Sequence, residues 1–315
     1  MVAPPTVTAT AGTLAAPGDF LALTKPRIVA LVLCTVAAGF VVALPTAARA
    51  AIGSGDGAGL ATLPVQLWIL ANTLLGTALV AGGTNALNQI AERDVDALMR
   101  RTRNRPLPAG RLEPGAARVF AWTIAILGVV ELAMAVNLTT ALLAALTLVS
   151  YVFAYTPLKR RTTLATLVGA VPGALPIVGG WTAAGAPIDA GAAVLFGILF
   201  LWQIPHFLAL SWMYRADYAR AGLRMLSIDD ETGAVTFRQA ALNAVGLFPI
   251  SLTPTILMMS GRVYFFTAAA LSLMLIVLSV AAARGPSPTS ARRLFLATLA
   301  YLPLLLGVLV ADRIA

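Results

Sequence analysis

The sequence predicts an all-α membrane protein that crosses the bilayer about nine times. Of its 315 residues, 59% are hydrophobic and only 11% are charged. The mean hydropathy of +0.87 is far above that of a typical soluble domain. The apolar residues are also grouped in stretches long enough to cross about 30 Å of hydrocarbon as helices.

Short breaks rich in Gly, Pro or charge separate the apolar stretches, and none is long enough to divide the chain into soluble domains. The stretches run approximately over 28–47, 64–86, 117–136, 138–157, 164–184, 190–213, 239–259, 263–283 and 294–311. We therefore expect a disordered tail over 1–18, which is rich in Ala, Thr and Pro, and a single transmembrane domain over 19–315. The only cysteine, Cys34, excludes an intramolecular disulfide.

The distribution of basic residues predicts how the chain is oriented. All of the 22 Lys and Arg residues except Arg49, Arg262 and Arg313 fall in alternate loops, beginning with the N-terminal segment. Cytoplasmic loops carry the excess of Lys and Arg in membrane proteins. We therefore expect the chain in the cell (inner, cytoplasmic) membrane, with the N-terminus in the cytoplasm and the C-terminus on the outer side. This topology accounts for the net charge of +9 without a nucleic-acid partner.

An unusual polar run, Asn88, Glu92 and Asp96, ends the second apolar stretch. On an α-helix, residues four positions apart share one face, at a rise of about 6 Å per step. Carboxylates at this spacing repel each other, and a cation between them would remove that cost. Oxygen ligands suit magnesium. The run therefore predicts a metal-diphosphate site at a membrane surface.

The loop that follows, 99–111, is dense in arginine and includes Arg101, Arg103 and Arg105. Guanidinium groups suit phosphate oxygens, and beside a metal they would neutralise a diphosphate as its carbon–oxygen bond breaks. The alternative is a loop that is basic for topological reasons and pairs with its own acids. This alternative explains the arginines but not Glu92 and Asp96.

A second polar region ends the fourth apolar stretch. It contains Tyr151, Tyr155, Lys159 and Arg160. Lys159 or Arg160 could hold a phosphate. The two tyrosine rings could face a carbocation through cation–π attraction, or they could belong to an interfacial aromatic belt.

A third polar region surrounds the only histidine, His206, and also includes Trp202, Asp217 and Tyr218. An ionisable group within a membrane helix is by default a functional candidate. Pro205 predicts a kink that frees carbonyl groups beside an internal cavity. Asp217 could complete the metal site.

Over nearly its whole length the chain resembles the UbiA superfamily of intramembrane prenyltransferases. The superfamily trait is the run of Asn88, Glu92 and Asp96. Four further motifs resemble the branch of the superfamily that farnesylates heme, and their shared order on the chain makes a chance match rare. They are Leu23-Thr24-Lys25-Pro26-Arg27, Arg101-Thr102-Arg103-Asn104-Arg105-Pro106-Leu107-Pro108, Tyr155-Thr156 with Leu158-Lys159-Arg160, and Trp202-Gln203-Ile204-Pro205-His206-Phe207.

The resemblance implies nine helices around a central cavity with a cytoplasmic cap. It also implies a Mg²⁺-dependent transfer of the farnesyl group of farnesyl diphosphate to a vinyl group of heme B, with addition of water, to give heme O and diphosphate. Heme B is then a substrate, and Mg²⁺ is the cofactor. Protein partners expected on this basis are heme A synthase and cytochrome oxidase assembly factors.

The resemblance also implies roles for individual residues. Mg²⁺ is expected on Glu92 and Asp96 with Asp217, and diphosphate on Arg101, Arg105 and Lys159. Asn85 and Asn88 are expected to orient oxygens, and His206 to contact the heme iron or a propionate. The further substrate-binding positions are Arg103, Tyr155, Arg160, Trp202 and Tyr218.

Four positions depart from the family pattern. Glu92 stands in place of the usual first Asp, and Ala165 in place of a common Asn. Ala216 replaces an acidic residue beside Asp217, and Arg224 replaces a Pro. The second acidic motif, around Asp217, therefore has fewer acidic residues than the family pattern, and the metal ligands beyond Glu92 and Asp96 are not determined by the sequence.

Two other functions are compatible with the sequence. The first is another UbiA-type enzyme whose acceptor is an aromatic acid or a quinone precursor. The second is a transporter or a heme-handling scaffold without catalysis. Transporters often show helices broken at mid-membrane and internal repeats, whereas the polar groups of this chain cluster at one surface.

Overall fold

The fold is helical throughout the computed structural model, which describes residues 16–53 and 63–314. Within these ranges, eight helical segments are long and apolar enough to cross a membrane. They are Pro26–Leu44 of α2 (Pro26–Gly53), α3 (Leu63–Ala91), α5 (Pro114–Ala135), the continuous run Leu138–Leu158, α8 (Ala165–Ala183), α9 (Ala190–Met213), α13 (Arg262–Arg284) and α14 (Pro288–Ala311). The predicted multi-pass, all-α fold class is confirmed.

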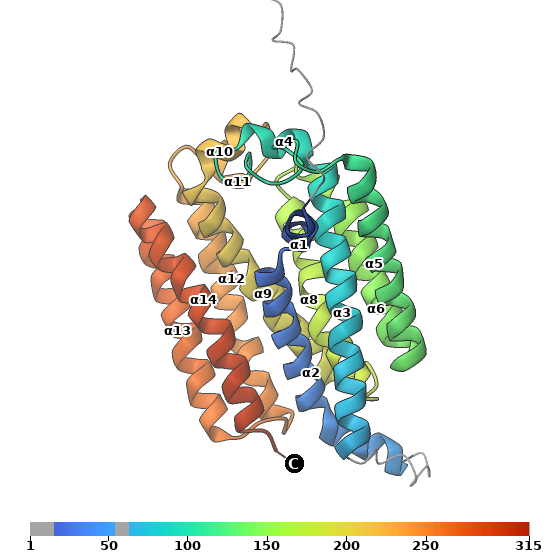
Figure 1. The fold of residues 1–315 in the computed structure, drawn as a ribbon. Helices are drawn as coiled ribbons and strands as arrows, with labels where there is room; N and C mark the ends of the chain where they lie inside the picture. The colour runs from blue at the N-terminus through green and yellow to red at the C-terminus, as the bar shows by residue number, and fades with distance from the viewer. Residues whose placement is uncertain (1–15, 54–62, 315) are drawn as a thin grey trace, which may run out of the picture.

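The remaining predicted span, 239–259, is also a helix, α12 (Ala234–Ile256), but it is not among those eight. Gln239 and Asn243 make it less apolar than its neighbours. Its buried side, which includes Ala240 and Ala244, packs against α9 and α13. In the described chain, nine long helical segments therefore run side by side (Figure 1).

Buried apolar side chains form two clusters that hold the bundle together. One joins α2, α8, α9, α12, α13 and α14, and the other joins α1 (Pro17–Thr24), α3, α5 and α6 (Leu138–Val149). Helices α2 and α8 approach so closely that a Cβ on Gly39 would overlap the carbonyl oxygen of Ile177, and one on Gly180 that of Val36. Because lipid is as apolar as leucine, such close packing of small residues is what holds membrane helices together.

Short elements cover one end of the bundle. Helices α4 (Arg93–Leu98), α10 (Arg215–Arg220) and α11 (Leu226–Asp229) gather there, opposite the end that carries the C-terminus (Figure 1). Buried Val95, Met99, Tyr218 and Leu223 form a small apolar cluster within this cap. The cap brings polar regions that are far apart in the sequence to a shared end of the molecule.

The predicted tail over 1–18 falls mostly on residues 1–15, which lie outside the described residues. Its last two residues, Pro17 and Gly18, instead begin α1. Proline suits the first turn of a helix because its missing N–H would be unpaired there anyway. Asp19 then ties α1 to the cap through an ion pair with Arg111, with an N–O distance of 3.1 Å.

The α2–α8 contact predicts different stabilities for two adjacent substitutions. Gly180→Ala places a methyl group against the backbone of Val36, which cannot retreat, so we expect the free energy of unfolding to fall by about 1–3 kcal/mol. Gly179→Ala is the matched control, because its added Cβ has no neighbour within 4 Å in the described chain beyond the adjacent residues and the nearby backbone of its own helix. Thermal unfolding in detergent measures both. Equal stability of the two variants would contradict the predicted packing.

Candidate active site

The predicted acidic face is interrupted at Glu92. Helix α3 ends at Ala91 and α4 begins at Arg93, with Glu92 between them at φ −100° and ψ 8°. The prediction of one continuous helical face is therefore wrong at this residue. The hydrogen bonding nonetheless continues, from Glu92 N to Asn88 O at 3.0 Å and from Asp96 N to Glu92 O at 2.7 Å.

The reason for the break lies in what each side of it contacts. The Glu92 side chain accepts a hydrogen bond from Lys159, while Val95 and Met99 pack with Tyr218 in the cap. Helix α4 therefore leaves the axis of α3 and runs across the end of the bundle (Figure 1). Glu92 and Asp96 remain on the same end but do not stand in one straight row.

Each carboxylate at the break is paired with a cation. Glu92 Oε1 lies 2.8 Å from Lys159 Nζ, and both side chains are largely buried. Asp96 Oδ2 lies 2.6 Å from Arg105 Nη1, and the Asp96 side chain is only 2% exposed. Arg105 of the basic loop thus pairs with a nearby acid, as the alternative interpretation of this loop predicts. Charges buried this deeply need such partners, because removing them from water is costly.

Amide side chains of α3 hold the end of α1 beside these pairs. Asn85 Nδ2 donates to Thr24 O at 3.2 Å, and Gln89 Nε2 donates to Leu23 O at 2.7 Å. The two carbonyl groups belong to the last turn of α1, where no intrahelical partner is available. The Asn85 amide nitrogen, which was expected to orient substrate, is therefore engaged in this structural contact.

Lys25 enters the site from the end of α1 although the sequence analysis gave it no role. Its backbone is left-handed, at φ 53°, and its Nζ donates to Asn88 Oδ1 at 3.4 Å. Burial, together with the positive charges of Arg105 and Lys159, lowers the pKa of Lys25 to about 7. A lysine just before an apolar stretch in a chain poor in charge was the available signal.

Lys159 is the most enclosed cation of the site. Its Nζ lies 4.3 Å from the centre of the Tyr155 ring and 6.0 Å from that of Tyr151. Burial alone lowers the pKa of Lys159, but the two tyrosines and the Glu92 carboxylate raise it above its ordinary value. The amine therefore stays charged. Both tyrosine rings thus lie near this cation, while their predicted contact with a carbocation stays a prediction.

A π-helical turn, η2 (Ser150–Tyr155), positions these tyrosines. The Thr156 hydroxyl donates to Tyr151 O at 2.8 Å and accepts a hydrogen bond from Asn88 Nδ2 at 3.1 Å. It thus joins the widened turn to α3. After the short helix α7 (Thr156–Leu158), Lys159 O accepts a hydrogen bond from Arg224 N at 2.8 Å, which joins the turn to the cap. Single π turns of this kind are frequent at functional sites.

The third polar region reaches the same end only in part. Arg101 lies over the Tyr214 ring at 5.1 Å, and buried Tyr218 has its pKa raised by burial. Asp217 instead forms an ion pair with Arg220 of its own helix. No three His, Cys, Asp or Glu side chains in the described chain are grouped to hold a metal. The predicted ligands Glu92, Asp96 and Asp217 are therefore each held by a cation.

The other predicted positions differ in their surroundings. Arg103 and Arg160 are exposed. Trp202 and His206 lie lower on α9 and face α14, where both contact Thr298. The cap end thus collects Asn88, Glu92, Asp96, Arg105 and Lys159, while the α9–α14 contact forms a separate aromatic group.

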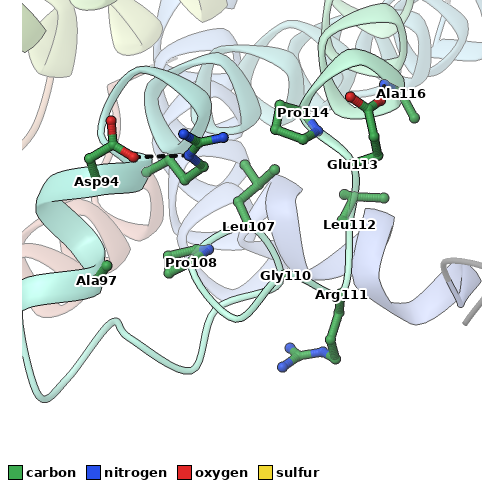
Figure 2. Close-up of a pocket in the computed structure, with 11 residues that line it drawn as sticks. Asp94, Ala97, Leu107, Pro108, Gly110, Arg111, Leu112, Glu113, Pro114 and Ala116 are labelled. Atoms are coloured by element: carbon green, nitrogen blue, oxygen red, sulfur yellow. Dashed lines mark hydrogen bonds and ion pairs between the residues drawn. The ribbon is translucent and has the colours of Figure 1, made fainter. Parts of the chain in front are cut away.

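A surface hollow of about 530 Å³ lies beside the cap but does not contain this charge cluster. Figure 2 shows it between α4, the loop around Leu107 and the start of α5. None of the predicted site residues lines it. The charged side chains that line it bind to nearby residues. Arg93 forms an ion pair with Asp94 at 3.0 Å, and Glu113 accepts a hydrogen bond from Ala116 N at 2.7 Å.

Largely buried ion pairs therefore gather at one end of a membrane helix bundle. The sequence profile described as the UbiA prenyltransferase family matches residues 42–302. This is most of the chain. The chain therefore belongs to the UbiA prenyltransferase family.

Curated relatives are similar over almost their full lengths. The protoheme IX farnesyltransferase of Solibacter usitatus is 44% identical over 295 residues, which cover 94% of this chain and 98% of the relative. That of Koribacter versatilis is 41% identical over 302 residues, covering 94% and 93%. The similarity thus extends over nearly all of this chain and of both relatives.

Solved structures share the fold. A digeranylgeranylglyceryl phosphate synthase structure has a TM-score of 0.74 at 15% identity, covering 94% of this chain and 97% of that one. A UbiA homologue from Archaeoglobus fulgidus, bound to GPP and Mg²⁺, has a TM-score of 0.58 at 16% identity, covering 92% and 99%. At these identities the likeness supports the helical architecture alone.

The lowered pKa of Lys25 predicts proton uptake when an anion binds. At pH 8 most Lys25 is neutral in the free protein, because its pKa is about 7. A diphosphate beside the amine favours the charged form and raises that pKa, so binding of inorganic diphosphate should take up close to one proton. The uptake should fade below pH 7, where Lys25 is already protonated. Calorimetry in two buffers of different ionisation enthalpy measures it.

Two substitutions test the assignment of that proton. Lys25→Met should abolish the uptake. Arg27→Met is the matched control, because it removes an exposed cation from the same segment. Equal uptake in the wild type and in Lys25→Met would contradict the role of Lys25.

Proposed function

We propose that the chain transfers the farnesyl group of farnesyl diphosphate to a vinyl group of heme B, with addition of water, giving heme O and diphosphate. The observation that carries this proposal is the partly buried cluster of Lys25, Lys159 and Arg105 around Glu92 and Asp96, in a chain over 40% identical to proteins named protoheme IX farnesyltransferase. A diphosphate supplies the negative charge that such a cluster of cations would receive.

The first step of the proposed reaction is the loss of diphosphate. The bond between the first farnesyl carbon and the diphosphate oxygen breaks, and its electron pair leaves with the oxygen. Buried Lys159 and partly buried Arg105 are charged and lie at this end of the bundle, and Arg101 lies nearby over Tyr214. Preorganised cations in a site of low dielectric stabilise developing negative charge far better than they would in water.

The oxygen donors of the site fit Mg²⁺. This ion prefers hard oxygen ligands, and the site offers the carboxylates of Glu92 and Asp96 and the side-chain amide oxygen of Asn88. In the structure, flexible Lys and Arg side chains neutralise the two carboxylates. In this proposal Glu92 and Asp96 hold the ion, and Asp217 joins them if its pairing with Arg220 is released. The bound ion supplies further neutralisation of the leaving group.

The second step is capture of the allylic cation. The π electrons of the heme vinyl group form the new carbon–carbon bond, and the positive charge moves to the vinyl carbon next to the macrocycle. Water adds to that carbon and loses a proton, leaving a hydroxyl group. Rings such as Tyr155 can stabilise cationic charge, and the apolar bundle keeps bulk water from the cation before the vinyl group attacks.

The proposed orientation places the cap in the cytoplasm of a cell with an inner membrane. The arginine loop and Lys159 belong to the loops that are rich in basic residues, and the C-terminus emerges at the opposite end of the bundle (Figure 1). Both substrates are amphiphiles that can enter from the bilayer. The product would pass to a membrane-bound heme-modifying or oxidase-assembly protein such as heme A synthase.

A product assay tests this function directly. The purified protein is incubated with farnesyl diphosphate, heme B and Mg²⁺, and the products are analysed by mass spectrometry. We expect heme that has gained one farnesyl group and one water, with an equal amount of diphosphate. Prenylation of a hydroxybenzoate or quinone precursor instead of heme would reject this acceptor in favour of another UbiA-type activity.

The acids of the site provide the controls. Glu92→Gln and Asp96→Asn should each lower the rate of diphosphate release by about 10²-fold or more, the usual effect of losing an electrostatic group from an active site. Asp94→Asn should retain wild-type activity, because the Asp94 side chain is 88% exposed and its ion pair is with the neighbouring Arg93. Wild-type rates in both acid variants would instead favour a non-catalytic scaffold.

A further inference from the structure

Two aromatic side chains stack on the His206 ring, one from each of two helices. Trp202, one turn earlier on α9, stacks on it with ring centres 5.3 Å apart, and Phe295 of α14 stacks on it at 4.8 Å. Phe207 meets the ring edge-on at 5.4 Å. The imidazole is therefore fixed between two helices, and only its ring edge is left to make polar contacts.

The hydrogen bonds of Thr298 fix the tautomer of this ring. The Thr298 hydroxyl carries one proton, and it donates that proton to Phe295 O at 2.6 Å. In its contact with His206 Nδ1, at 2.9 Å, the hydroxyl must therefore accept. It follows that Nδ1 carries the ring proton and that Nε2 carries the free lone pair. Trp202 Nε1 also donates to Thr298 O, at 2.8 Å, which fixes Thr298 itself.

The Nε2 atom has no hydrogen-bond partner among the described residues. It is also absent from the enclosed polar atoms that lack one, which in the described chain are Ser227 Oγ, Thr236 Oγ1 and Ser279 Oγ. The atom therefore opens onto accessible space. An imidazole with Nδ1–H bonded to a protein oxygen and a bare Nε2 is the usual arrangement of a metal-ligating histidine.

We propose that His206 Nε2 is an axial ligand of the iron of the acceptor heme. The inference rests on the proposed function for the identity of the metal, since the iron arrives with the substrate. Ligation fixes the centre of the macrocycle, so the reacting vinyl group on its rim keeps a constant distance from α9. Thr298 positions the ligand through Nδ1, and Trp202 and Phe295 prevent the ring from rotating.

The position of His206 along α9 suits this role. Tyr214, which lies under Arg101, follows His206 by about two helical turns, roughly 12 Å along the axis. A heme bound to His206 therefore lies on the apolar side of the cation cluster. Its rim can approach the end where the diphosphate departs, while the iron remains away from the cluster of charges.

Absorption and EPR spectra of the full-length protein with ferric heme B test the ligation. The wild type should show a nitrogen-ligated heme. His206→Gly should lose this signature, and added imidazole should restore it, which a merely structural role of the ring would not allow. Thr298→Val should weaken heme binding by about 10-fold or more, whereas Thr298→Ser should not. An unchanged spectrum in His206→Gly would overturn the proposal.

The choice of acceptor gives a second readout. With metal-free protoporphyrin IX in place of heme B, the wild type should show a KM at least about 10-fold higher, and Thr298→Val should lose most of this preference. Equal KM values for both porphyrins in the wild type would overturn the ligation. The spectra do not require turnover. A wild type that binds heme through His206 but makes no farnesylated heme would thus reject the proposed function while supporting the ligation.

Discussion

The structure depends on the compensation of charge inside an apolar bundle. Asp96 and Glu92 are removed from water at the end of α3, and each would be costly without a partner of opposite charge. Lys159 arrives from the turn after α6 and Arg105 from the loop after α4. Meeting these partners breaks the α3–α4 helix at Glu92, widens the chain into the π turn before Thr156, and brings the cap over the bundle.

The same compensation suits the proposed chemistry. An ion pair between flexible side chains can be exchanged when a ligand offers better partners to both members, so diphosphate can draw Lys159 and Arg105 while Mg²⁺ takes their place on the carboxylates. Burial and neighbouring cations lower the pKa of Lys25 to about 7. Its charge can therefore respond to the arrival of the anion. Charge is thus balanced both before and after binding.

Hydropathy was sufficient to predict the helical fold, because the length of an apolar stretch is set by the thickness of the bilayer. Motif order also predicted that Asn88, Glu92, Asp96, Arg105 and Lys159 share one end. Spacing could not predict the break at Glu92, since it arises from contacts with Lys159 and the cap that are distant in sequence. For the same reason it missed Lys25 and could not show that Asp217 pairs with Arg220 or that His206 faces Thr298.

The central claim is that Lys159 occupies the place a divalent cation takes beside Glu92. Mn²⁺ binding, followed by EPR without any diphosphate, measures this in Lys159→Met and in the wild type, with the exposed neighbour substituted in Arg160→Met as the control. Lys159→Met should bind Mn²⁺ roughly 10-fold or more tightly than the wild type, because Glu92 is left uncompensated. Unchanged or weaker binding in Lys159→Met would contradict the central claim.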